Sequence, residues 1–163
     1  MKIFVDADSC PRLTREAVLR AAARTGIQAI FAANRPIPAV SGATAVMEQC
    51  PPGEDSADNR IVELARPGDL VITRDIPLAS RLVEASIMVL DDRGRTYTTE
   101  NIRERLSLRN FILGLAEQGG GNTRNPHYGK RELKRFADSF DRMLSHLMRE
   151  AAQAPGYHPP SSG

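Results

Sequence analysis

Residues 2–11 read Lys2-Ile-Phe-Val-Asp6-Ala-Asp8-Ser-Cys-Pro11, an apolar run that ends in two acids and a proline. The apolar, β-favouring run before Asp6 predicts a buried strand, and proline at this point is typical of the first turn of a helix, with Ser9 or Cys10 as its N-cap. A strand that leads directly into a helix brings its final acids to the carboxyl edge of a parallel sheet, where open α/β folds keep their active sites. Asp6 and Asp8 are therefore the first candidate site residues.

Alternating apolar runs and amphipathic segments follow this start, and glycine or proline separates many of them. In a helix predicted for 98–117, the apolar positions are Ile102, Leu106, Phe111 and Leu115. The order of strands and crossover helices predicts an α/β fold around a parallel sheet. We expect strands at 27–32, 43–47, 69–73 and 87–90, and helices at 11–24, at 57–65, from Pro77, at 98–117 and after the glycine-rich connection 119–129.

The chain has 163 residues, of which 41% are hydrophobic, and this size predicts one domain, residues 1–150. Residues 151–163 have the composition of a disordered tail. A net charge of +2 favours neither a nucleic-acid binder nor a membrane-surface protein, although the middle of the chain is acidic and the end, from 124 to 149, is basic.

Cysteine content and hydropathy bear on the compartment. Two cysteines, Cys10 and Cys50, form no disulfide framework, and a core strand at the very start leaves no room for a signal peptide. No apolar run approaches the ~20 residues that a membrane span needs. We expect a cytoplasmic protein without a membrane partner, either a monomer or a homodimer.

Acids also follow other predicted strands, at Asp75 and at Asp91-Asp92, and Asp58 begins a helix that leads into the strand before Asp75. Acids that meet at one sheet edge repel each other unless a pKa rises or a cation binds. Hard carboxylate oxygens suit Mg²⁺ or Mn²⁺, which can activate water and screen a phosphate. We therefore expect Asp6, Asp8 and Asp75, joined by Asp58, to form a metal site for phosphoester hydrolysis.

A plainer interpretation is that each acid only caps a helix or a turn, and the turn residues Arg93-Gly94 favour it for Asp91 and Asp92. Polar and basic residues beside the acids are candidates for substrate binding. Ser9 and Thr73 are placed to hydrogen-bond a phosphate or to act as caps, and Asn34 follows the second strand at the same edge. Basic residues that would hold phosphates are Arg12, Arg35, Arg74, Lys130 and Arg131.

Several motifs in a fixed order resemble the YaiI/YqxD family of bacterial proteins. The resemblance runs from about residue 2 to about residue 115, and the family has no established activity. Membership implies a fold similar to the PIN-like nucleases, a three-layer sandwich with a mostly parallel sheet between helices. The motifs are Val5-Asp-Ala-Asp-Ser-Cys-Pro11, Ala33-Asn-Arg-Pro36, Asp55-Ser-Ala-Asp-Asn59, Gly68-Asp-Leu-Val-Ile-Thr-Arg-Asp-Ile-Pro-Leu-Ala79, Arg93-Gly94 with Tyr97-Thr98, and Ile102-Arg-Glu-Arg-Leu106.

PIN-type nucleases carry acids after the first strand, in a central helix, and after a strand ending in Thr-x-Asp. Asp6, Asp58 and Asp75 fall on these positions, and Asp8 is an addition of the family. The resemblance therefore implies a nuclease dependent on Mg²⁺ or Mn²⁺ that acts on RNA, with the four acids as ligands or their neighbours.

Two other functions stay open. An Asp-x-Asp after the first strand is also typical of phosphatases of the haloacid dehalogenase type, in which the first aspartate is the nucleophile. That chemistry uses a lysine, and none occurs between Lys2 and Lys130. The second alternative is a non-catalytic module that binds RNA or a protein. Its acids would then serve metal-dependent folding or act as caps.

Overall fold

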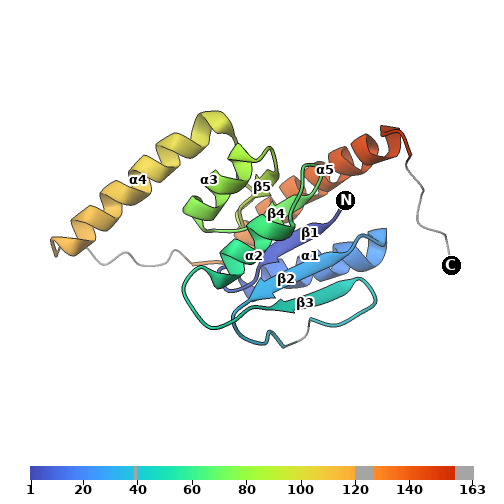
Figure 1. Cartoon of the computed structure of the whole chain (residues 1–163), viewed down its shortest axis with the longest axis horizontal. Helices are drawn as coiled ribbons and strands as arrows, with labels where there is room; N and C mark the ends of the chain where they lie inside the picture. The colour runs from blue at the N-terminus through green and yellow to red at the C-terminus, as the bar shows by residue number, and fades with distance from the viewer. Residues whose placement is uncertain (39, 120–126, 157–163) are drawn as a thin grey trace.

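Six strands form one sheet in the computed structural model, which describes residues 1–38, 40–119 and 127–156 (Figure 1). The strand order is β3-β2-β1-β4-β5-β6, so β1 lies near the centre. The first five strands are parallel, whereas β6 is antiparallel to β5. The strands are β1 (Ile3–Asp6), β2 (Ala29–Ala33), β3 (Ala45–Gln49), β4 (Leu70–Ile72), β5 (Met88–Leu90) and β6 (Thr96–Tyr97).

Helices cover both faces of this sheet, so the molecule is the three-layer α/β sandwich that was predicted. On one face lie α1 (Arg12–Thr25) and α5 (Lys130–Gln153). On the other lie α2 (Ser56–Leu64) and α3 (Ile76–Glu84), with α4 (Thr99–Glu117) against α3. The basic C-terminal helix, whose place the sequence did not predict, therefore packs behind the sheet beside α1.

Strand β1 shows why the central strands are apolar without a break. Its side chains alternate between the two cores, because successive residues of a strand point to opposite faces. Ile3 and Val5 lie in the core with Phe136 of α5, whereas Phe4 lies in the core with Leu82 of α3. Both faces of a parallel sheet are buried here, so every position of the strand is apolar until Asp6.

Two local features differ from the prediction. Strand β6 was not expected, because two residues after a tight turn are too short for a period-two pattern to be visible. Helix α1 begins at Arg12 with Pro11 at the N-cap position and no side-chain cap. Neither predicted cap, Ser9 or Cys10, caps this helix, and Ser9 instead donates a hydrogen bond to the carboxylate of Asp6 at 2.8 Å.

Parts of the predicted connection and tail, at 120–126 and 157–163, lie outside the described residues. Within the described parts of the chain, no helix is both long and apolar enough to cross a membrane.

Candidate functional site at the carboxyl edge of the sheet

A cavity of about 270 Å³ opens at the carboxyl edge of β1, and the charged residues that line it are all acidic. The lining comes from four separate segments: the turn after β1, the end of β2, the residues leading into α2, and the residue before α3. The parallel sheet brings them together because all of its strands end at this edge. The lining residues are Asp6, Asp8, Ser9, Asn34, Gly53, Glu54, Asp55, Ser56, Ala57, Asp58 and Asp75.

Asp6 is held rigidly at the base of this cavity. Its side chain is almost fully buried, with 3% of the residue exposed. One carboxylate oxygen, Oδ2, accepts hydrogen bonds from Ser9 Oγ and from Thr73 Oγ1, both at 2.8 Å. Burial raises the pKa of Asp6, its two hydrogen bonds oppose the rise, and the negative charges of Asp75 and Asp8 add to it. The other oxygen, Oδ1, carries no hydrogen bond from the described residues.

Thr73 links Asp6 to Asp75. Its hydroxyl donates to Asp6 and accepts a hydrogen bond of 2.9 Å from the backbone N–H of Asp75. Thr73 is fully buried and is not among the residues that line the cavity. In the structure it therefore orients two acids, and a direct contact with substrate stays a prediction.

Asp75 both caps a helix and lines the cavity, so the two sequence interpretations, a cap and a site residue, apply to it together. Its Oδ1 accepts a hydrogen bond of 2.9 Å from the backbone N–H of Leu78, so the residue caps helix α3. The residue also lines the cavity. Capping occupies one oxygen, which leaves Oδ2 for a ligand.

Asp8 lies at the rim, where it ties the end of β2 to the turn after β1. Its Oδ2 accepts a hydrogen bond of 2.9 Å from the backbone N–H of Asn34, and its Oδ1 lies 3.5 Å from Nε of Arg35. Asn34 lines the cavity, whereas Arg35 is only connected to it through Asp8. The structure thus brings both sequence candidates from this loop to the same rim.

Asp58 faces the other acids from the first turn of α2. Burial raises its pKa from 3.8 to about 7, and the charges of Asp6, Asp75 and Asp55 contribute, while Arg81 opposes the rise. A carboxyl group with this pKa exchanges its proton near neutral pH. Asp58 can therefore switch between a neutral and a charged state near neutral pH.

Arg74 pairs with the buried acid Asp92, whereas the next residue, Asp75, lines the cavity. Its Nε lies 3.4 Å from Oδ1 of Asp92, and its backbone N–H donates to Ser9 Oγ at 3.3 Å. Arg74 is not among the residues that line the cavity. Asp92 is 1% exposed, its Oδ2 has no hydrogen-bond partner in the described structure, and burial raises its pKa. Its charge is therefore balanced mainly by Arg74.

Asp91 has the plainer role predicted for it. Its Oδ1 accepts hydrogen bonds of 2.8 Å from the backbone N–H groups of Arg93 and Arg95. The carboxylate therefore stabilises the turn between β5 and β6.

Two acids of the cavity were not among the sequence candidates, namely Glu54 and Asp55. Both lie in the segment just before α2, and Asp55 has a left-handed backbone with φ of 61°. The density of acids in the run Gly53-Glu-Asp-Ser-Ala-Asp58 was the signal that could have indicated them. Turn and cap chemistry explains an acid just before a helix equally well, so the sequence alone did not single out Asp55.

The donor chemistry of the cavity suits a hard divalent cation, although the ligand set is not closed. Among the residues described, no group of three or more His, Cys, Asp or Glu side chains is arranged to hold a metal ion. Mg²⁺ is commonly held by only one or two carboxylates, with water and substrate phosphate completing the shell. One or two of Asp6, Asp58 and Asp75 would provide such oxygens.

Fold and cavity together define an α/β protein with an acidic site at the carboxyl edge of a parallel sheet. The chain belongs to the YaiI/YqxD family, because the model described as "Uncharacterized BCR, YaiI/YqxD family" (DUF188) matches residues 4–146. The family resemblance of the sequence is thus confirmed, while the likeness to PIN-like nucleases stays a prediction.

Relatives from several bacteria cover nearly the whole chain. A UPF0178 protein of Treponema pallidum is 51% identical over 93% of this chain and 85% of its own length. UPF0178 proteins of Syntrophobacter fumaroxidans and Myxococcus xanthus are 44% and 42% identical, over 89% and 91% of this chain and 95% and 97% of their own lengths. No solved structure matches the chain significantly.

Proposed function

We propose that this protein is a nuclease dependent on Mg²⁺ or Mn²⁺ that hydrolyses phosphodiester bonds, with RNA as its substrate. One observation carries the proposal: acids from three distant segments line a single cavity, and the pKa of two of them, Asp6 and Asp58, is raised partly by the other acids. A cation relieves such repulsion, and phosphodiester hydrolysis is chemistry that uses a carboxylate-held cation.

The residues of the chain have separate tasks in this proposal. A bound cation would lower the pKa of a water and offset the negative charge of the phosphate. One or two of Asp6, Asp58 and Asp75 would supply oxygens to it, and Asp8 holds the rim of the cavity. Ser9 and Thr73 keep Asp6 oriented through their hydrogen bonds to Oδ2, so its Oδ1 faces a ligand without reorganisation.

Basic groups near the rim would orient the nucleic acid. Arg35 beside Asp8 and Arg74 beside Asp92 are held by ion pairs at 3.5 and 3.4 Å, which limits their motion. With Asn34 at the rim, they offer donors to the phosphates on either side of the scissile bond. Contacts of this kind release counterions, so binding of RNA should weaken steeply as salt concentration rises.

The test is cleavage of a mixed-sequence single-stranded RNA with Mn²⁺, with Mg²⁺ and with chelator. We expect metal-dependent cleavage by the wild type and its loss in Asp58→Asn. The matched control is Asp138→Asn, which removes an exposed acid on α5 that pairs with Lys134 at 3.0 Å, and it should cleave like the wild type. Equal metal-dependent cleavage by Asp58→Asn and the wild type would contradict the assignment of the site.

The same proteins separate the two competing functions. Turnover of a phosphate monoester without cleavage of RNA, together with a phosphoaspartate trapped by a fluoride analogue, would indicate a phosphatase. Stabilisation by Mn²⁺ with no turnover of either substrate would indicate a non-catalytic module.

A further inference from the structure

Helix α4 carries an apolar surface that no described part of the chain covers. Five of the seven large apolar side chains exposed among the described residues fall within positions 108–115 of this helix. Phe111 is 64% exposed and Leu108 is 56% exposed, while Ile102, near the start of the helix, is its buried residue. Figure 1 shows α4 reaching away from the sheet beyond α3. Large apolar groups gathered in this way mark an interaction site.

Four of these side chains form a continuous line, which we call the apolar stripe: Leu108, Phe111, Ile112 and Leu115. Their spacing of i, i+3, i+4 and i+7 places them on one face of the helix. None of the four is charged, and all are exposed. A partner that covers only the apolar stripe therefore buries no charged side chain.

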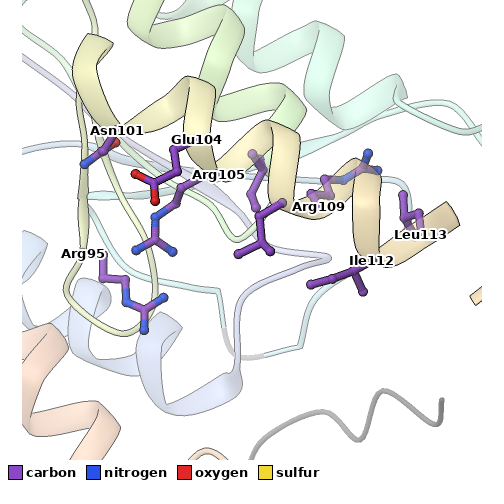
Figure 2. A pocket seen from close by; sticks show the side chains of 9 residues that line it. Arg95, Asn101, Glu104, Arg105, Arg109, Ile112 and Leu113 are labelled. Carbon is purple, nitrogen blue, oxygen red and sulfur yellow. The ribbon is translucent and has the colours of Figure 1, made fainter. Parts of the chain in front are cut away.

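Most charged residues of α4 precede Ile112, and Glu117 is its last residue. A hollow of about 540 Å³ lies between α4 and Ile76 with the turn that leads into β6, and it extends along the helix so that Leu108 and Ile112 of the apolar stripe also line it. Figure 2 shows Arg95, Arg105 and Ile112 around this hollow. Arg105 also lies over the ring of Tyr97, with its guanidinium carbon 6.0 Å from the ring centroid. The helix is thus charged at one end and apolar towards the other.

We infer that the apolar stripe is the interface of a homodimer in which α4 of one copy pairs antiparallel with α4 of a second copy. The spacing of the apolar stripe reads the same in both directions. Antiparallel pairing about the midpoint between Phe111 and Ile112 places Leu108 against Leu115 of the other copy, and Phe111 against Ile112. A two-fold interface requires this self-complementarity, in which residue i meets j and j meets i.

The charges favour the antiparallel direction. Parallel helices would place Arg105 against Arg105 and Glu104 against Glu104. Antiparallel helices place Arg105 beside Gln118 of the other copy, thirteen residues along the helix, so the two Arg105 side chains stand roughly 20 Å apart. That separation exceeds the Debye length of ~8 Å, and each cation then lies near the negative end of the facing helix.

The first test is the mass of the protein in solution, measured by sedimentation velocity over a hundredfold range of concentration. We expect a dimer for the wild type and a monomer for Phe111→Glu, because the symmetric interface receives the charge twice. Met148→Glu is the matched control, since it places the same charge on an exposed apolar site of α5, and it should stay dimeric. Circular dichroism confirms that each variant is folded. A wild type that is monomeric throughout, or a dimeric Phe111→Glu, would overturn the inference.

The second test is the direction of pairing, by oxidative cross-linking. Leu108→Cys and Leu115→Cys proteins, one lengthened by a tag, should form a mixed disulfide when combined. Leu115→Cys alone should not, since the two copies of position 115 lie roughly 10 Å apart along an antiparallel pair, beyond the reach of a disulfide. The native thiols, Cys10 and Cys50, are buried and do not compete. Faster cross-linking of Leu115→Cys with itself would exclude the antiparallel arrangement. Both tests are independent of nuclease activity.

Discussion

Replacing Asp58 with Asn should stabilise the protein at alkaline pH when divalent cations are absent. The carboxyl group is half-buried in the first turn of α2, and burial and the neighbouring acids raise its pKa from 3.8 to about 7. Because the pKa is raised in the folded state, the folded protein keeps a proton up to about pH 7 that the unfolded chain loses near pH 4. The free energy of unfolding therefore falls between these two pH values and stays lower above pH 7.

The size of the expected change in the free energy of unfolding follows from the rise in the pKa of Asp58. At about 1.4 kcal/mol per pKa unit, a change from 3.8 to about 7 corresponds to an upper limit of ~4 kcal/mol. Solvent screens a group that keeps contact with water, so we expect ~1–2 kcal/mol from removing the charge. An acid in the first turn also gains ~0.3–1 kcal/mol from the helix dipole, which opposes the effect but is smaller.

The assay is urea unfolding in chelator at pH 5 and at pH 8. Asp58→Asn should be more stable than the wild type at pH 8 by ~1–2 kcal/mol, and the difference should shrink at pH 5. Asp138→Asn should show no such gain. Adding Mn²⁺ at pH 8 should stabilise the wild type more than Asp58→Asn. A variant less stable than the wild type at pH 8, or a gain independent of pH, would refute the electrostatic reasoning.

Two further substitutions and one labelling reaction test other contacts of the fold. Thr73→Val removes the hydroxyl that donates to Asp6. In urea unfolding, the variant should lose ~1–3 kcal/mol of its free energy of unfolding, and Mn²⁺ should stabilise it less than the wild type. Unchanged stability would exclude the role of Thr73 in linking the two acids. Gly94→Ala places a Cβ 2.5 Å from a backbone oxygen of α5, at a φ of +84°. Its melting temperature should fall further than that of Gly68→Ala, because Gly68 has a φ of +94° but open space around it. Equal decreases in the two melting temperatures would contradict the clash. Burial raises the pKa of the Cys10 thiol well above its usual value, so a thiol reagent at pH 8 should modify it only after unfolding, and rapid labelling of the native protein would disprove its burial.

The sequence was sufficient to predict the sandwich and the edge on which its acids lie. Unbroken apolar runs such as Leu70–Ile72 indicate strands buried on both faces, and acids at their ends mark the carboxyl edge without any knowledge of distances. Strand β6 was not predicted, because it is defined by its antiparallel pairing with β5. Its two residues are too few to show a strand pattern in the sequence.

The periodicity of α4 shows where pattern reasoning reaches its limit. The apolar positions Ile102, Leu106, Phe111 and Leu115 correctly predict a helix, yet of these only Ile102 is buried. Periodicity reports that a helix has an apolar face, whereas burial depends on whether another element stands opposite that face. In the described chain, α3 stands opposite only the first part of α4.

By itself, the sequence determined that an α/β sheet carries Asp6, Asp8 and Asp75 on one edge, because strand and helix periods are local properties of the chain. Only the tertiary structure decided how these acids behave. The hydrogen bond from Thr73 to Asp6 joins residues 67 positions apart, and the pKa of Asp58 depends on charges from other segments. Such properties arise from distances across the fold and from exclusion of water, and neither is encoded in the spacing of residues along the chain.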